Sequence, residues 1–443
     1  MHLAGVELSV LLPVLNERDN LAELLPRLAR VLDTLGCRSE VVVVDGGSTD
    51  GTAETARRLG ARVLEQRQPG YGTALREGFA AVRGRFVLTL DADLSHDPDF
   101  IGKLWRARHS ADILIASRYV TGGVAIMPRM RLILSRVLNA FFARGLSLPL
   151  HDLSSGFRLY RSALLAELTL QGRNFEILEE VLVKAYAAGW RVRELPFMYY
   201  PRARGSSHAR IVRFGIDLLR AFWTLWALRN SVESADYDER AFYSRIPLQR
   251  YWQRKRHQIV TTMARGQGRT LDVGCGSSII LQSLNDAVGL DIKHSKLRYM
   301  RQYGVPLVGG SVTALPMRDA TFDCVVCSQV IEHIPDDPLI LAELLRVLRP
   351  GGLLILGTPD YATLSWRLIE PLYGLAAPGG YKEEHITHYT FADLRARAEA
   401  LGLELTSHAY VLQGELILAL RKPVAMDCAR TSPVAGSALR GTG

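Results

Sequence analysis

The chain has 443 residues, of which 48% are hydrophobic and 22% are charged. This balance excludes an intrinsically disordered protein, and the length exceeds that of one ordinary domain, so we expect two packed domains. The formal net charge of +9 suits nucleic acid, an anionic membrane surface or phosphate-bearing substrates without choosing among them.

Short β-rich runs alternate with helical stretches over residues 8–117. Helices are expected near 19–35, 52–59, 73–83 and 99–108. The expected strands are Leu8–Leu12, Glu40–Val44, Arg62–Leu64, Phe86–Leu90 and Ile113–Ala116. This alternation predicts an α/β domain with a mostly parallel sheet and helices on both faces. Ligands of such sheets bind beyond the carboxyl ends of the strands.

Acidic side chains follow three of these strands. Asn16 and Glu17 come after the first strand, Asp45 closes the second, and Asp91 and Asp93 come after the fourth. In a parallel sheet all three positions lie at one edge. A carboxylate there can accept a hydrogen bond from a base or a ribose, and an Asp-x-Asp pair suits Mg²⁺ or Mn²⁺ on a diphosphate. The sequence therefore predicts a nucleotide-sugar site with Asp91 and Asp93 as metal ligands.

These residues resemble the family-2 glycosyltransferases of the GT-A fold, and among them the dolichol- or polyprenyl-phosphate sugar transferases. The resemblance covers about residues 7–228. The matching stretches are PVLNE (13–17), VDGGSTDGT (44–52), DADLSHDP (91–98), ASRY (116–119), DLSSGFRLY (152–160) and PRARGSS (201–207). Gly46 stands where that family often has a second Asp, and His208 where it often has Lys.

The resemblance also implies roles for individual residues. Asp45 would contact the nucleotide base, and Arg202 and His208 would lie on a loop that closes over the site. Inversion at the anomeric carbon is implied as well. The nucleotide-sugar set is Pro13, Asn16, Glu17, Asp45, Asp91, Ala92 and Asp93. The acceptor-phosphate set is Arg118, Arg131, Ser135, Arg202 and His208.

The chemistry of the acceptor decides which catalytic groups are needed. A lipid phosphate is already an anion near neutral pH, so it needs positioning and charge screening, which forked arginine donors supply. A hydroxyl acceptor would need a carboxylate base, for which Asp152, Glu179 and Glu180 are candidates. The expected catalytic residues are Asp91, Asp93, Arg118, Arg131 and Asp152.

Two apolar stretches bear on membrane contact. Phe214–Leu228 has one polar stripe and two Trp residues, so it is either an interfacial helix or a core helix. Ile133–Leu150 could guide a prenyl tail or pack in the core. No run of about 20 apolar residues and no signal-peptide pattern occurs. We expect a cytoplasmic protein lying peripherally on the cytoplasmic membrane face.

A second alternating series begins at Thr270, after a basic, aromatic stretch at Tyr237–Arg256 that we interpret as a structured linker. Its expected strands are Thr270–Val273, Ala287–Leu290, Pro306–Val308, Cys324–Cys327 and Leu353–Leu356. Glycines after the first of them allow close approach of a ligand, and Asp291 ends the next strand at an offset that suits a ribose diol. Cys324 and Cys327 are expected to be buried strand residues of a protein in a reducing compartment.

This series resembles class I S-adenosylmethionine methyltransferases, with a Rossmann-like fold, over about residues 262–421. The stretches that carry it are TLDVGCGSS (270–278), FDCVVCSQVIEHI (322–334) and LRPGGLL (348–354). The implied cofactor set is Asp272, Gly274 and Gly276 around the methionine part, Asp291 at the ribose, Ser311 near adenine and Gln329 in the methyl-transfer pocket. For a hydroxyl acceptor, candidate bases are His333, His385 and His388.

The expected organisation is a glycosyltransferase domain (1–230), a linker (231–261), a methyltransferase domain (262–421) and a disordered tail (422–443). The expected reaction moves a hexose, with mannose as first candidate, from a nucleotide sugar to a polyprenyl phosphate. The second domain would methylate a glycan, lipid or small molecule. The alternatives are a hydroxyl acceptor, or a basic membrane- or nucleic-acid-binding protein that only senses S-adenosylmethionine. Nucleic acid is not our expected partner.

Overall fold

The computed structural model describes residues 5–201, 211–376 and 385–424. Contacts divide the chain into two compact units. The first contains Met1–Ala241 with Lys293–Gly304 and Tyr373–Lys382, and the second contains Phe242–Ile292, Val305–Leu372 and Glu383–Gly443.

The first unit is built on a seven-stranded sheet with the order β3-β2-β1-β4-β7-β5-β8. Strands β1 to β4 run parallel to one another, whereas β7 is antiparallel to both of its neighbours, so the sheet is mixed rather than simply parallel. Its strands are β1 (Leu8–Val14), β2 (Ser39–Asp45), β3 (Arg62–Glu65), β4 (Phe86–Thr89), β5 (Ile113–Ser117), β7 (Arg158–Arg161) and β8 (Val192–Pro196), beside the pair β6 (Val124–Ala125) and β9 (Met198–Tyr199).

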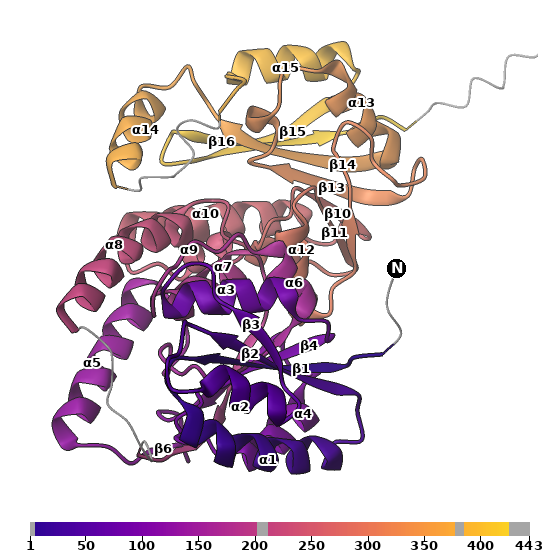
Figure 1. The fold of residues 1–443 in the computed structure, drawn as a ribbon. Coiled ribbons are helices and arrows are strands. Elements are labelled where there is room, and N and C mark those ends of the chain that lie inside the picture. Colours follow the sequence, from indigo (N-terminus) through magenta and orange to yellow (C-terminus); the bar gives the residue numbers. More distant parts are fainter. Residues whose placement is uncertain (1–4, 202–210, 377–384, 425–443) are drawn as a thin grey trace, which may run out of the picture. The chain divides into compact units, whose positions relative to one another are not determined.

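Helices cover both faces of this sheet, because the runs at its centre are apolar on both sides. In β1 and β2, alternate residues enter two separate cores. Figure 1 shows the two helical layers. One layer contains α1 (Arg18–Thr34), α2 (Thr52–Arg58), η1 (Pro98–Phe100) and α4 (Ile101–Ala107). The other contains α3 (Tyr71–Ala81), α5 (Arg129–Gly145), α6 (Ser162–Glu167), α7 (Ile177–Ala187) and α8 (Ile211–Asn230), and α9 (Tyr237–Phe242) follows it.

Helices α5 and α8 pack together through aromatic rings. Phe222 and Leu225 of α8 are buried in the core, and the Phe222 ring stacks on Phe141 with centroids 5.3 Å apart. The stretch expected to be either an interfacial or a core helix therefore packs in part against the protein, while Trp223 stays 65% exposed. None of the described helices is long and apolar enough to cross a bilayer.

The second unit contains another seven-stranded sheet, with the order β12-β11-β10-β13-β14-β16-β15. Only β16 and β15 add antiparallel pairs. The strands are β10 (Thr270–Val273), β11 (Ala287–Asp291), β12 (Leu307–Gly309), β13 (Phe322–Ser328), β14 (Leu348–Pro359), β15 (Glu404–Val411) and β16 (Glu415–Arg421). The helices along this stretch are α10 (Pro247–Ala264), α11 (Ile279–Ser283), α12 (His294–Met300), η2 (Arg301–Tyr303), η3 (Ile331–His333), α13 (Pro338–Val347), α14 (Leu364–Ala376) and α15 (Phe391–Ala400). Of these, α12 and η2 belong to the first unit.

The basic stretch expected to be a linker is helical. Helix α10 packs Val260 and Ala264 against strands β13, β14 and β16. Its Arg256 forms an ion pair with the buried Glu415 of β16, at 2.5 Å between Nε and Oε1.

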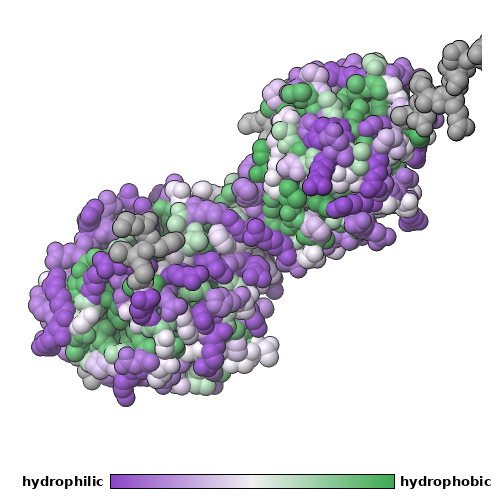
Figure 2. All heavy atoms as spheres, turned by 90° about the vertical axis from the view of Figure 1, so that its right-hand side faces the viewer, coloured by the Kyte–Doolittle hydropathy of each residue, from purple (hydrophilic) through white to green (hydrophobic). Residues whose placement is uncertain are grey.

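Cys324 and Cys327 lie fully buried in β13, as expected, and burial raises the pKa of the Cys324 thiol to about 12. On the face drawn in Figure 2, hydrophobic residues lie in patches among hydrophilic ones.

Candidate active sites

The acidic residues of the first unit lie at one edge of its sheet. Strands β2, β1 and β4 are adjacent and parallel. Asp45 ends β2, Asn16 and Glu17 follow β1, and the Asp-Ala-Asp segment follows β4. Because carboxyl ends of parallel strands share an edge, these positions lie along one edge of the sheet.

Hydrogen bonds join the loops that follow β1 and β2. The Asn16 side-chain oxygen accepts from the Thr49 amide at 2.9 Å, and the Asn16 amide donates to the Ser48 hydroxyl at 2.8 Å. Asp45 is 6% exposed and accepts from the Ser48 amide and hydroxyl. A Cβ on Gly46 would lie 3.1 Å from Gln66 Oε1 and 3.2 Å from the Val14 carbonyl, so an aspartate there would be crowded. Asp45 is therefore the carboxylate that the structure holds at the carboxyl end of β2.

Asp91 and Asp93 have different supports. Asp93 is 4% exposed, and its Oδ1 accepts from the Ser95 amide at 3.1 Å and from the Ser95 hydroxyl at 2.5 Å. The Asp91 amide donates to His96 Nδ1 at 3.1 Å, so that nitrogen carries no proton, and burial lowers the His96 pKa. Tyr71 donates to Asp91 Oδ1 at 3.3 Å. A neutral imidazole and a phenol therefore position Asp91, and sequence reasoning missed both, since each resembles an ordinary core aromatic residue.

Arg118 forms a buried, bidentate ion pair with Asp152. Its Nε lies 2.8 Å from Oδ2 and its Nη2 lies 2.6 Å from Oδ1. Asp152 is fully buried, and its carboxylate raises the pKa of Arg118 against the opposing effect of burial. Nη2 also donates to the Ser154 hydroxyl at 2.8 Å. The pair fixes the guanidinium plane, and it disfavours Asp152 as a general base because both of its carboxylate oxygens already accept from Arg118.

A pocket of about 170 Å³ contains two of the expected acceptor residues, Arg131 and Ser135. It is lined by Arg131, Leu134, Ser135, Leu138, Asn139, Phe142, Ser154 and Glu179. The Ser135 hydroxyl accepts from the Tyr119 hydroxyl at 2.7 Å, and Asn139 donates to the Ser154 hydroxyl at 3.0 Å. Ser154 thereby connects this pocket to the Arg118 guanidinium. Arg202 and His208 lie outside the described residues.

The other two candidate bases differ in their surroundings. Glu180 accepts from the Gln171 and Gly172 amides and pairs with Lys184, so it has a structural role. Glu179 is 5% exposed, and its Oε2 has no hydrogen-bond partner among the described residues. Burial raises the pKa of Glu179 to about 7. Glu179 is therefore the acid in this pocket that can exchange a proton near neutral pH.

The raised pKa of Glu179 predicts a measurable pH dependence of stability. Between its unfolded pKa of 4.5 and its folded pKa of about 7, the folded chain keeps a proton that the unfolded chain releases. Stability therefore falls as pH rises through this range, by about 3 kcal/mol, and stays level above it. Glu179→Gln should lack this loss. Urea unfolding of both proteins at pH 5 and pH 8 checks it, and equal losses would contradict it.

The expected cofactor residues of the second unit also gather at one sheet edge. Gly274 and Gly276 follow β10, Asp291 ends β11, Ser311 follows β12, and Gln329 follows β13, all parallel neighbours. The Gly276 amide donates to Asp291 Oδ2 at 2.8 Å. Asp272 is buried within β10. Ser311 Oγ lies 2.8 Å from the Thr313 hydroxyl. This arrangement fits a nucleoside cofactor across the strand ends.

Gly274 is a position where a side chain would disturb that site. Its φ is +68°, and an added Cβ would lie 2.2 Å from Val330 Cγ2. We expect Gly274→Ala to weaken S-adenosylmethionine binding at least about 10-fold, since relief of the clash must move the turn that contacts the ligand. Gly266→Ala is the matched control, because Gly266 has a φ of +76° and open space around its Cβ position. Isothermal titration of both variants tests this, and equal affinities would contradict it.

Comparison with known proteins finds matches in two separate parts of the chain. Residues 9–169 match the model of glycosyl transferase family 2, and residues 271–356 match that of a methyltransferase domain. The dolichol-phosphate mannosyltransferase of Pyrococcus furiosus is 36% identical over 213 residues, which are 46% of this chain and 59% of that protein. An uncharacterized glycosyltransferase of Mycobacterium tuberculosis (strain ATCC 25618 / H37Rv) is 34% identical over 223 residues, which are 50% of this chain and 98% of that protein.

Among solved structures, glucosyl-3-phosphoglycerate synthase from Mycobacterium tuberculosis, in complex with Mn²⁺, UDP and glucosyl-3-phosphoglycerate, is 21% identical. The match covers 50% of this chain and 80% of that one, with a TM-score of 0.41. The two family matches and the two sheets define an enzyme with a glycosyltransferase domain of GT-A type and a Rossmann-like methyltransferase domain. Through its N-terminal part the chain belongs to glycosyl transferase family 2.

Proposed function

We propose that the first unit transfers a hexose, with mannose as first candidate, from a nucleotide sugar to a polyprenyl phosphate. The observation that carries the proposal is the pocket that contains Arg131, Ser135 and Ser154 and adjoins the fixed Arg118 guanidinium. Arginine forks suit phosphate oxygens, and the hydroxyls can donate to them. The relative from Pyrococcus furiosus, named as a dolichol-phosphate mannosyltransferase, supports the same acceptor class.

The donor half of the proposal rests on the strand-end carboxylates. Two carboxylates spaced as Asp91 and Asp93, one of them nearly buried, form a donor set that fits Mg²⁺ or Mn²⁺. Such an ion, when bound, neutralises the charge of the departing diphosphate. Asp45 would accept a hydrogen bond from the base, beside Pro13, Asn16 and Glu17. His96 and Tyr71 would keep Asp91 oriented before the donor arrives.

The polyprenyl chain needs an apolar path next to its phosphate. Helix α5, which carries Arg131 and Ser135, exposes apolar side chains along most of its length, and α8 adds two more. Their exposures are Met130 78%, Ile133 56%, Leu134 53%, Val137 59%, Phe141 50%, Leu219 56% and Trp223 65%. An exposed apolar surface of this kind marks a lipid or partner contact. We therefore place the prenyl chain and the membrane surface against α5 and α8.

A hydroxyl acceptor is the second candidate, favoured by Glu179. A carboxyl group with a pKa of about 7 and an oxygen without a hydrogen-bond partner among the described residues could remove a hydroxyl proton. A phosphate acceptor gives the same residue another role, since the protonated acid can donate to a phosphate oxygen. The two candidates thus predict opposite outcomes for Glu179→Gln, which keeps a donor but cannot act as a base.

For the second unit we propose methyl transfer from S-adenosylmethionine to a glycan, lipid or small molecule. The turn at Gly274 and Gly276, with Asp291 on the neighbouring strand, supports the cofactor assignment. Gln329 has a φ of +60°, donates its amide to the Gly357 carbonyl at 2.7 Å, and follows β13 directly. It would line the pocket in which donor and acceptor align, and alignment is the main requirement of methyl transfer.

The test of the glycosyl transfer offers the purified full chain a panel of nucleotide hexoses, GDP-mannose first, with Mn²⁺ and two matched acceptors. These are a polyprenyl phosphate and the polyprenol of equal length. Transfer to the phosphate, with Glu179→Gln still active, supports the proposal. Transfer only to the hydroxyl, with Glu179→Gln inactive, establishes the second candidate. Failure of both acceptors with every nucleotide sugar would overturn both.

A further inference from the structure

Three ligand-type side chains meet beyond the carboxyl end of β13. Glu332 and His333 form the short helix η3, and His385 arrives from the segment that precedes α15. One ligand atom from each of the three lies within 4.8 Å of the others. Backbone bonds hold the two segments together, since the Ile386 and Thr387 amides donate to the Glu332 carbonyl at 2.8 Å and 3.1 Å.

Glu332 is the most unusual member of this group. Its side chain is fully buried, and neither carboxylate oxygen has a hydrogen-bond partner of good geometry among the described residues, the Thr358 hydroxyl being only a weak contact. Burial raises its pKa to about 8. A buried carboxyl group without partners is costly, and proteins ordinarily pair such groups or use them to coordinate metals. Two imidazoles lie beside Glu332, so a metal ion bound by all three side chains could compensate its buried charge.

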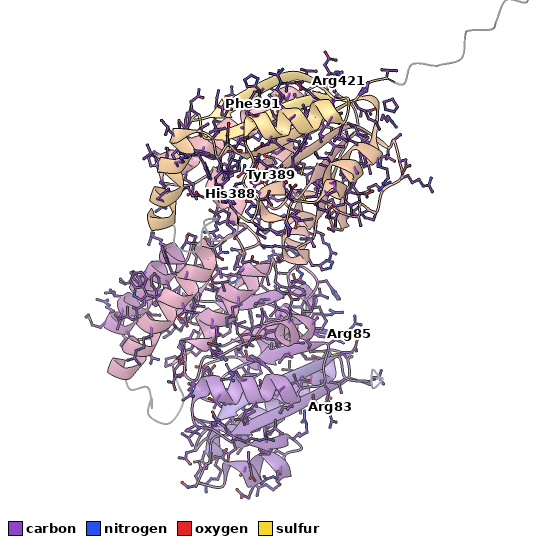
Figure 3. All side chains as sticks on the ribbon, turned by 90° about the horizontal axis from the view of Figure 1, so that it is seen from above. Arg83, Arg85, His388, Tyr389, Phe391 and Arg421 are labelled. Carbon is purple, nitrogen blue, oxygen red and sulfur yellow. The ribbon has the colours of Figure 1, made fainter. Side chains whose placement is uncertain are left out.

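His385 is held in an orientation typical of a metal ligand. Its Nδ1 lies 2.8 Å from the Tyr361 hydroxyl and 3.4 Å from Glu370 Oε1. Metal-binding histidines usually contact a carboxylate or another polar group through the second ring nitrogen, which sets the tautomer and the direction of the first. Tyr361 is itself fixed, because its ring stacks on His388 with centroids 4.0 Å apart. Figure 3 labels His388 and Tyr389 on this segment, just before α15 begins at Phe391.

We propose that Glu332, His333 and His385 bind a divalent transition-metal ion in the second unit, with Zn²⁺ the best match. Two imidazoles and one carboxylate form a three-ligand set that leaves a coordination position open. Imidazole ligands favour Zn²⁺ and its neighbours over Mg²⁺ or Mn²⁺, so this site differs in kind from the carboxylate site of the first unit. Because Gln329 precedes η3 in the chain, the open position would face the methyl-acceptor end of the sheet and take an oxygen or nitrogen of the acceptor.

The test uses the full chain, freed of metal with a chelator and titrated with Co²⁺ as a spectroscopic substitute for Zn²⁺. All proteins carry Asp93→Ala, which removes the proposed carboxylate site from the measurement. We expect one equivalent of Co²⁺ with visible absorption of a site containing nitrogen ligands, and displacement by Zn²⁺. Glu332→Gln and His385→Gln should weaken binding well beyond 10-fold, and Tyr361→Phe by about 10-fold, the cost of losing an outer-shell partner.

His408→Ala is the matched control, because His408 is an exposed histidine on β15 of the same unit. It should bind Co²⁺ like the parent protein. Glu332→Gln has the shape of the protonated acid and should keep the fold, which circular dichroism verifies. Binding that Glu332→Gln and His385→Gln leave unchanged would overturn the proposal. So would a folded parent protein that binds no Co²⁺, which would show that Glu332 is only a buried neutral acid. Metal binding is measured without turnover, so its outcome is independent of the proposed methyl transfer.

Discussion

Asp93→Asn is expected to lower the rate of hexose transfer by about 10³-fold or more while leaving the fold unchanged. The substitution keeps the side-chain shape and the bonds from Ser95, but it removes the charge that would hold the metal at the diphosphate. Loss of that charge stabilisation is worth several kcal/mol of activation free energy, and about 1.4 kcal/mol corresponds to each factor of ten in rate. Steady-state transfer from a radiolabelled nucleotide sugar measures the effect.

The matched control for this variant is Asp99→Asn. Asp99 is exposed and follows the same strand a few residues later, so its loss should change the transfer rate little. The second unit supplies another control, because S-adenosylmethionine should bind Asp93→Asn as it binds the parent protein. If Asp93→Asn retained most of the transfer activity, the metal-ligand role would be wrong. Loss of both activities with the fold preserved would contradict independent sites.

Arg118→Leu is expected to destabilise the first unit by about 3–5 kcal/mol, because it leaves the fully buried Asp152 without its counter-charge. Arg118→Lys should lose less stability than Arg118→Leu but more than none. An ammonium keeps the charge but cannot reproduce the two-point contact with the carboxylate. Urea unfolding measures both changes, and hexose transfer should be lost in Arg118→Leu under conditions where it remains folded.

Arg193→Leu serves as the control for the arginine substitutions, because Arg193 is an exposed residue of β8. Its substitution should change the free energy of unfolding little. In a second comparison, Arg118→Leu combined with Asp152→Leu should recover part of the stability, since no unpaired charge remains. A cost below about 1 kcal/mol for Arg118→Leu would mean that water compensates Asp152, which contradicts a fixed, desolvated guanidinium at the acceptor site.

The parallel parts of both sheets could be predicted from the sequence, because strands buried on two faces read as apolar runs, such as Val41–Val44. The same reasoning predicts that Asp45 and Asp93 share an edge, since only strand direction and adjacency are needed. Strand β7 could not be predicted in this way. It begins with Arg158, a charged residue that is fully buried because its guanidinium donates to the Leu178 and Leu153 carbonyls. Those partners are set by tertiary structure.

The side-chain constellations were harder to predict than the sheet edges. Tyr71 reaches Asp91 from α3, and Glu179 reaches the Arg131 pocket from α7, so neither contact follows from local spacing. His385 could be considered only as an isolated candidate base until the fold brought it to Glu332. Long-range packing determines these groupings, and a period of two or 3.6 residues carries no information about them.

The central claim is that carboxylates from the ends of β2 and β4 converge on one metal-bound diphosphate. Anomalous diffraction from crystals grown with Mn²⁺ and a nucleoside diphosphate tests it most directly. The account predicts a manganese peak within coordination distance of Asp93 and a diphosphate oxygen, with the base against Asp45. Manganese and nucleotide located elsewhere, with Asp45 and Asp93 contacting neither, would contradict it.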